Sequence, residues 1–92
     1  MLIESVVWLS SVVDKLAVKR HVESSEVEEV LDNEPKIRFM EKESERAKMY
    51  LALGQTDAGR YPAVMFIYKK TKKALILSAR DMPNKERRKY EK

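Results

Sequence analysis

Four residues in the last part of the chain carry the side chains that cleavage of an RNA phosphodiester requires. Arg80 follows the apolar run ALILSA at 74–79, and Glu86, Arg87 and Tyr90 lie in the charged segment that comes next. In RNA cleavage without a metal, a base takes the 2′-hydroxyl proton, cations stabilise the phosphate charge, and an acid protonates the leaving 5′-oxygen. Arginine suits phosphate because its planar guanidinium can bind two oxygens at once. These four residues are therefore the candidate catalytic group.

Helical spacing predicts that three of these side chains lie close together. Glu86 and Tyr90 are four residues apart, and Arg87 and Tyr90 are three apart, so each pair adjoins on a helix surface. Pro83 suits the first turn of that helix and limits how far its side chains can move relative to Arg80. The alternative is an ordinary solvated helix with Glu–Arg pairs, and spacing alone does not separate the two interpretations.

Charge is unevenly distributed along the chain. Residues 69–92 carry ten Lys and Arg against three Asp and Glu, whereas residues 1–68 carry nine against twelve. A basic end is typical of proteins that contact nucleic acid, although small soluble domains also carry basic tails by chance. We predict RNA contacts by two groups of side chains, namely Lys19, Arg20 and His21, and Lys69, Lys70, Lys72 and Lys73.

Three other features have plainer interpretations. The acidic stretch 23–34 is expected to be the solvated face of a helix, with a partner-binding patch as the alternative. His21 is more simply a helix-end residue than a catalytic base, and Trp8 is more simply a core residue than a platform for base stacking. Arg60, beside a glycine turn, is expected to be solvated.

Composition excludes several classes of site and compartment. A length of 92 residues predicts one domain, 1–92. The absence of cysteine excludes disulfides and thiolate metal sites and fits a cytoplasmic protein. A single histidine cannot form a zinc site, and no apolar run approaches the roughly 20 residues of a membrane span. We therefore expect no metal, no cofactor and no membrane association.

The first half of the chain is expected to form a strand and two helices. Residues 2–9 are rich in valine and isoleucine and predict a strand. Helical spacing of apolar residues then predicts helices over 10–20 and 21–33. Serine is expected to cap both helices, with Ser25 and Glu28 in the S-x-x-E pattern on the second.

The second half is expected to form four strands and a last helix. Strands are predicted at 36–40, 47–54, 61–68 and 74–79, with Ile37 and Phe39 pointing inward. Because their connections are short, an antiparallel meander is the economical arrangement. The predicted order is β-α-α-β-β-β-β-α. This is an α+β fold, an antiparallel sheet with two helices on one face and a short C-terminal helix.

Over nearly its whole length the chain resembles the BrnT-like toxins of bacterial type II toxin–antitoxin systems. The most specific segments are ILSAR and KERRKY, which span 76–90, followed by ALGQTDAGR at 52–60. The resemblance also rests on Trp8, on KRHV at 19–22, and on SSEVEEVL at 24–31.

This resemblance implies a fold similar to RelE-type ribonucleases and metal-independent RNA cleavage that inhibits translation. It also implies neutralisation by a small antitoxin, expected to be of the ribbon-helix-helix type, through which alone the toxin would be linked to DNA. On this basis Arg80, Glu86, Arg87 and Tyr90 are the catalytic candidates, with Lys19 and Trp8 as further ones. Two alternatives stay open, a non-catalytic RNA-binding module and a structural subunit that binds only protein.

Overall fold

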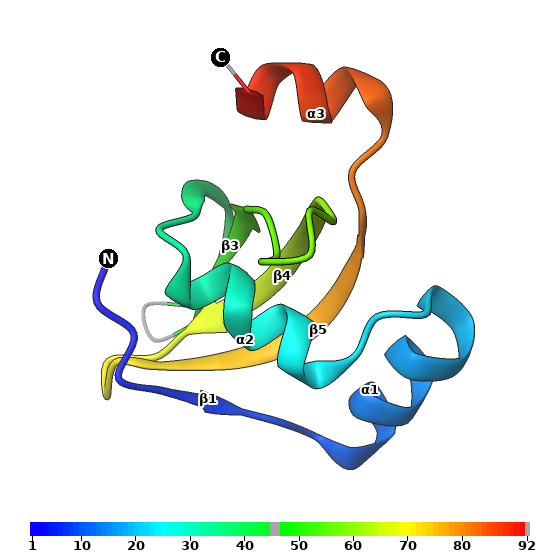
Figure 1. Cartoon of the computed structure of the whole chain (residues 1–92). Coiled ribbons are helices and arrows are strands. Elements are labelled where there is room, and N and C mark those ends of the chain that lie inside the picture. The colour runs from blue at the N-terminus through cyan, green and yellow to red at the C-terminus, as the bar shows by residue number, and fades with distance from the viewer. Residues whose placement is uncertain (45–46, 92) are drawn as a thin grey trace.

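The computed structural model describes residues 1–44 and 47–91 and is a mixed α+β structure with a five-stranded sheet (Figure 1). Its elements in chain order are β1 (Ser5–Val7), α1 (Ser10–Lys15), a π-helical segment η1 (Leu16–Arg20), α2 (Ser24–Asp32), β2 (Lys36–Ser44), β3 (Ala47–Leu53), β4 (Pro62–Tyr68), β5 (Lys73–Asp81) and α3 (Asn84–Glu91). The five strands match predicted strands, but the predicted helix over 10–20 is a short α-helix followed by a π-helical segment, and several boundaries differ.

The sheet has the order β1-β5-β4-β3-β2 and is mixed. Strands β2 to β5 form the predicted antiparallel meander. The prediction of a purely antiparallel sheet is wrong, because β1 runs parallel to β5, with Val6 opposite Ala74. Parallel neighbours need a long connection. The connection from β1 to β5 contains two helical regions and the strands β2, β3 and β4. The first strand thus pairs with the last strand of the chain.

The first strand is much shorter than the predicted 2–9 and covers only three residues. Before the strand, the Glu4 N–H donates to the Lys72 carbonyl over 2.8 Å, and the Leu2 carbonyl accepts a hydrogen bond from the Tyr68 hydroxyl. On the other side Trp8 packs against the core, and its indole N–H donates to Glu28 Oε1 over 3.2 Å.

The helices are capped differently from the prediction. His21 adopts a left-handed conformation (φ 55°) that ends η1, and its carbonyl is turned towards other elements. Helix α2 begins at Ser24, so Glu23 is its cap residue. The Glu23 backbone N–H donates to Glu26 Oε1 over 3.0 Å. A glutamate pair therefore occupies the position predicted for the serines.

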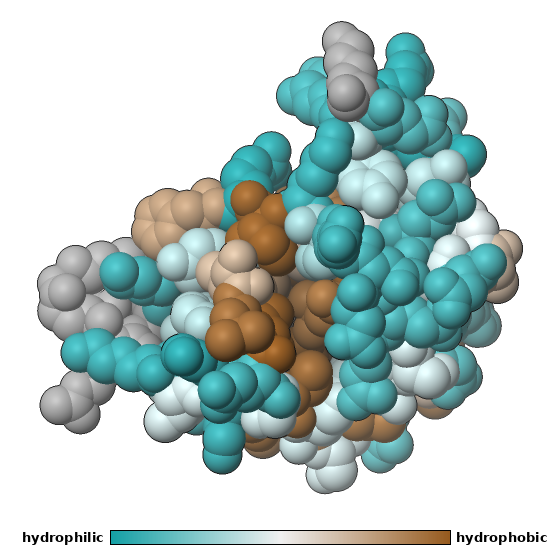
Figure 2. All heavy atoms as spheres, turned by 60° about the vertical axis from the view of Figure 1, so that its left-hand side comes forward, coloured by the Kyte–Doolittle hydropathy of each residue, from teal (hydrophilic) through white to brown (hydrophobic). Residues whose placement is uncertain are grey.

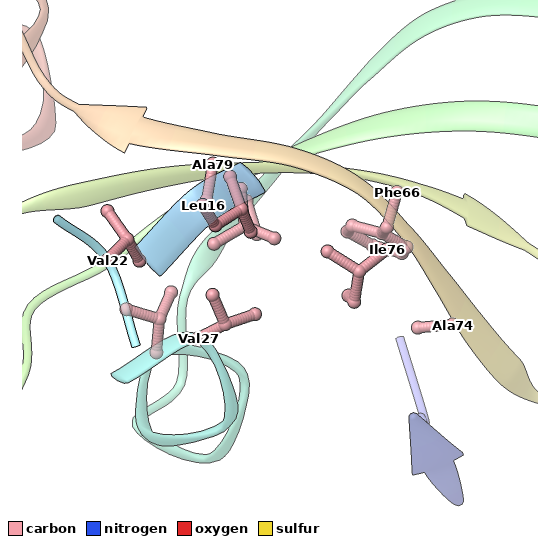
Figure 3. Packing of buried hydrophobic residues seen from close by; sticks show 10 residues of the cluster. Leu16, Val22, Val27, Phe66, Ala74, Ile76 and Ala79 are labelled. Atoms are coloured by element: carbon pink, nitrogen blue, oxygen red, sulfur yellow. The ribbon is translucent and has the colours of Figure 1, made fainter. Parts of the chain in front are cut away.

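The main core lies between the sheet and the segment that runs from η1 to α2. Leu16, Val22, Val27 and Val30 are buried there against Ala52, Val64, Phe66, Ala74, Ile76 and Ala79. Figure 3 shows the helical side chains pointing at the side chains of the strands. The predicted layer of two helices is found in part, because η1 and α2 both enter this core but α1 has no buried residue.

A second, smaller core fixes α3 to the molecule. Leu51, Leu53, Ala63 and Met82 are buried together, with Tyr61 and Tyr90 packed against them. Leu53 and Ala63 lie opposite one another in the sheet, and Ala63 lies opposite Arg80. Since neighbouring residues of a strand point to opposite faces, this core lies on the other side of the sheet from Val64 and the main core.

Strand β2 departs from its prediction in length and in burial. It continues to Ser44, past the predicted end at residue 40, and its pairing with β3 contains irregularities after Phe39 and after Lys42. Phe39 was predicted to be buried but is 53% exposed. The reason is that β2 is an edge strand, which among the described residues has only β3 beside it.

Candidate functional site

Arg80 and Glu86 form a bidentate salt bridge at the point where β5 leads into α3. Arg80 Nη1 donates to Glu86 Oε1 over 2.7 Å, and Nη2 donates to Oε2 over 3.2 Å. The Glu86 side chain is only 16% exposed, while that of Arg80 is 41% exposed. The hydrogen bond to Glu86 raises the pKa of Arg80 above its ordinary value, against the opposing effect of burial. The pair therefore presents a permanent cation, beside a shielded carboxylate, to solvent.

Arg87 and Tyr90 lie on α3, the helix that carries Glu86, and both contact Tyr61. The Arg87 guanidinium lies 3.9 Å from the centre of the Tyr61 ring, and its Nε donates to Glu91 Oε1 over 2.9 Å. The rings of Tyr61 and Tyr90 meet edge to face with 6.0 Å between their centres. Of the four predicted catalytic residues, Arg80 and Glu86 are thus in direct contact, whereas Arg87 and Tyr90 share a neighbour.

Lys36 completes the surroundings of Tyr90 and was not predicted to do so. Its ammonium lies 5.3 Å from the centre of the Tyr90 ring and also donates to the Tyr90 carbonyl at the C-terminal end of α3. A cation is favoured at that end of a helix dipole. No sequence pattern links residues so far apart in the chain, and only the pairing of β2 with β3 brings Lys36 beside α3.

Arg60 is the most connected of the described side chains, although it was expected to be solvated. Its guanidinium donates to Asp81 over 2.7 and 3.1 Å and to Glu26 over 3.0 and 3.2 Å. It also donates to the carbonyls of Arg20 and His21. The hydrogen bond from Arg60 lowers the pKa of Asp81. Arg60 therefore ties the end of η1, the start of α2 and the end of β5 together.

The predicted basic group of Lys19, Arg20 and His21 lies near the end of β5 that carries Arg80, but on the opposite face of the sheet. Its backbone is held by Arg60, whose second partner, Asp81, directly follows Arg80. Adjacent residues of a strand point to opposite faces, so Arg80 reaches Glu86 while Asp81 reaches Arg60. All three basic side chains are exposed.

The predicted basic group at Lys69–Lys73 is not close to Arg80. Lys69, Lys70 and Lys72 are exposed in the turn between β4 and β5, and Lys73 is the exposed first residue of β5. Arg80 lies at the opposite end of β5, seven residues beyond Lys73. At about 3.3 Å per residue, the two ends are roughly 20 Å apart. The turn can therefore contact RNA only as a separate point, away from the Arg80–Glu86 pair.

Other sites are limited in the part of the chain that the structure describes. Across residues 1–44 and 47–91, no three acidic or histidine side chains are grouped so that they could hold a metal ion. Within the same ranges, no helix is both long enough and apolar enough to cross a membrane. Trp8, a further candidate from the family resemblance, packs against the main core.

No protein-family model matches the chain, and no curated protein matches it significantly. The arrangement of the side chains is therefore the basis for an argument about function.

Proposed function

We propose that this protein is a toxin of a type II toxin–antitoxin system, a cytoplasmic endoribonuclease that works without a metal and inhibits translation. The observation that carries the proposal is the bidentate contact at the end of β5 between the partly exposed Arg80 and the more shielded Glu86. The resemblance of 76–90 to BrnT-like toxins, although no family comparison supports it, motivates the choice of RNA as substrate.

The proposed reaction gives one role each to Glu86, Arg80 and Tyr90. Glu86 accepts the proton from a 2′-hydroxyl, whose oxygen attacks the adjacent phosphorus. Arg80 stabilises the charge that builds on the phosphate oxygens. Tyr90, one helical turn beyond Glu86, donates a proton to the leaving 5′-oxygen. The bond from phosphorus to the 2′-oxygen forms and the bond to the 5′-oxygen breaks, which leaves a 2′,3′-cyclic phosphate and a 5′-hydroxyl.

The backbone around the pair supports a fixed geometry. The Met82 N–H donates to the Tyr61 carbonyl over 2.8 Å, and the Arg87 N–H donates to the Pro83 carbonyl over 2.9 Å. Met82 itself is buried in the second core. Catalytic groups that are misplaced by about 1 Å can lose two orders of magnitude in rate. A strand, a short turn and a helix that are anchored in this way suit a phosphate site.

RNA binding would use the part of Arg80 that Glu86 leaves open. A guanidinium has five N–H donors, and Glu86 occupies two nitrogens on one edge. The exposed remainder of the side chain faces solvent, where a phosphate can approach. Arg87 and Arg88, both exposed on α3, add positive charge nearby. The antitoxin, proposed to be a ribbon-helix-helix protein, would neutralise the toxin by covering this basic region.

A second candidate, binding of RNA without cleavage, is favoured by one specific observation. Glu86 is already paired with Arg80, so both oxygens that would accept a proton are engaged. If RNA binding does not free one of the two Glu86 oxygens from Arg80, the same surface binds phosphate but has no base to accept the proton. The two functions differ in the role of the Glu86 carboxylate alone.

Replacement of Glu86 by glutamine separates cleavage from binding. Glutamine keeps the size of the side chain but cannot take a proton. We expect Glu86→Gln to lower the initial rate of RNA cleavage by about 100-fold or more, while the Kd for RNA changes by less than threefold. Glu91→Gln is the matched control, because Glu91 lies on the same helix and pairs with Arg87. Equal cleavage by both variants would support binding without cleavage at this site or cleavage elsewhere.

A further inference from the structure

A hollow lined by apolar and polar groups in similar measure lies on a different part of the molecule from the Arg80–Glu86 pair. It opens between the segment before β1, the end of α2 and the start of β2, and its volume is about 490 Å³. Its apolar lining comes from Leu2, Ile3, Leu31 and Ile37. Figure 2 shows apolar side chains gathered in a depression on this face, with polar side chains around them. Binding sites for ligands commonly have volumes of roughly 300–1,000 Å³.

The apolar surface continues beyond the hollow along β2. Phe39, two residues after Ile37 and on the same face, packs edge to face on Tyr50 with 5.6 Å between the ring centres. Leu2 is 61% exposed and Phe39 is 53% exposed. Large apolar side chains that are grouped and exposed mark interaction sites more often than single ones do. The hollow and Phe39 together are called the β2 groove below.

The charge at the β2 groove is negative. Glu4, Asp32 and Glu34 line the hollow together with Met1, which carries the α-amino group, and no lysine, arginine or histidine side chain does so in the part of the chain that the structure describes. Three carboxylates repel the phosphates of RNA, so this is not a second RNA surface. They attract lysine and arginine. The combination of apolar lining and acidic rim therefore favours a protein segment that is both apolar and basic.

The strand beside the groove can pair with such a segment. β2 is the edge of the sheet, and it is paired with β3 alone among the described residues. From Lys36 to Phe39 its pairing is regular, and the first irregularity follows Phe39. A bulge of this kind limits pairing along the rest of an edge. An added strand would run beside this short regular stretch, and every second side chain would point to the face that carries Ile37.

We propose that the β2 groove binds an extended segment of a partner protein in which apolar side chains alternate with lysine or arginine. The segment adds a short strand to the edge of β2 at 36–39. Its apolar side chains enter the hollow beside Ile37, and its cations pair with Asp32 and Glu34. Ile37 and Phe39 lie on the opposite face of the sheet from Arg80. The proposal therefore does not rest on the ribonuclease assignment.

Two synthetic ten-residue peptides test the proposal, one of alternating leucine and lysine and one of alternating leucine and glutamate. Binding is measured by fluorescence anisotropy of labelled peptides with the full chain at 0.15 M salt. We expect the lysine peptide to bind and the glutamate peptide to bind at least tenfold more weakly. In the Asp32→Lys/Glu34→Lys variant, affinity for the lysine peptide should fall at least tenfold. Binding of both peptides with equal affinity, or of neither, overturns the proposal.

The matched control is Asp14→Lys/Glu91→Lys, which changes the net charge by the same amount at two exposed positions outside the groove. It should keep at least half of the wild-type affinity. An equal loss in both double variants would mean that net charge alone attracts the peptide, which overturns the site. Hydrogen exchange should show protection by the lysine peptide at 36–39, and protection only elsewhere contradicts the pairing. If sedimentation instead finds a dimer of this chain that Asp32→Lys/Glu34→Lys dissociates, the occupant is a second copy and the proposed partner is wrong.

Discussion

Arg80 and Asp81 are neighbours in β5 and take part in two ion pairs on opposite faces of the sheet. Arg80 pairs with Glu86 of α3, and Asp81 pairs with Arg60 in the turn before β4. The first pair is the proposed site. The second fixes the end of β5 against the start of α2, because Arg60 also binds Glu26. Alternation along one strand thus places a functional residue directly beside a structural one.

The Asp81–Arg60 pair predicts a dependence of stability on pH. The pKa of Asp81 is lowered in the folded protein. Its contribution is therefore fully present above the ordinary Asp value of about 4 and is lost as pH falls through the folded pKa. We expect Asp81→Asn to reduce the free energy of unfolding at pH 7, and the difference from wild type to shrink below about pH 4. Urea denaturation at pH 7, 4 and 3 measures this difference.

The effect should be small and should weaken at high salt, because the Asp81 side chain is 60% exposed. Arg60→Met provides the control, since Asp81 then no longer has the guanidinium that lowers its pKa. In that background, Asp81→Asn should leave the pH dependence nearly unchanged. A difference between wild type and Asp81→Asn that stays constant from pH 7 to 3 would contradict the assignment.

At the scale of elements, Gly54 at the end of β3 allows close packing of α2. A Cβ atom at this position would lie 2.7 Å from Val30 Cγ1 and 3.4 Å from the Val30 carbonyl oxygen. Both residues are buried, so neither can move into solvent. We expect Gly54→Ala to lower the free energy of unfolding by about 1–3 kcal/mol. A double-mutant cycle with Val30→Ala checks the cause, because removal of the Val30 methyl groups should relieve part of this loss. Strict additivity of the two changes would show that the crowding lies elsewhere.

The sequence predicted the positions of the strands and helices better than the contacts between them. Apolar residues on one face of 47–54 and on both faces of 61–68 located β3 and β4 to within one residue. The parallel pairing of β1 with β5 was missed, since it depends on which edge the helices leave open. Arg80 and Glu86 were expected to lie together because only five residues, one of them Pro83, lie between them. Arg60 was misjudged because Glu26 and Asp81 are 34 and 21 residues away.

At the scale of the whole molecule, the basic residues form two separate regions rather than one continuous surface. The turn at 69–73 and the Arg80–Glu86 pair occupy opposite ends of β5. We expect replacement of Lys69, Lys70, Lys72 and Lys73 by glutamine to weaken binding of a 20-nucleotide RNA. The slope of log K against log salt should fall by about 0.7 for each phosphate that the turn no longer binds. Binding of a dinucleotide at Arg80 should not change, because so short an RNA cannot reach the turn. Equal weakening for both RNAs would show that the lysines act through net charge alone.

The central claim is that Arg80 acts on a phosphate, and the cleavage rate of the Arg80→Lys variant tests it most directly. Lysine keeps a positive charge beside Glu86, so the fold and the melting temperature should be nearly those of wild type. It loses the planar fork that binds two oxygens. We predict that purified Arg80→Lys cleaves RNA at least 100-fold more slowly than wild type and no longer arrests growth, whereas Arg88→Lys on the exposed face of α3 retains both activities. Cleavage by Arg80→Lys at the wild-type rate, with unchanged melting, would contradict the account and remove Arg80 from the site.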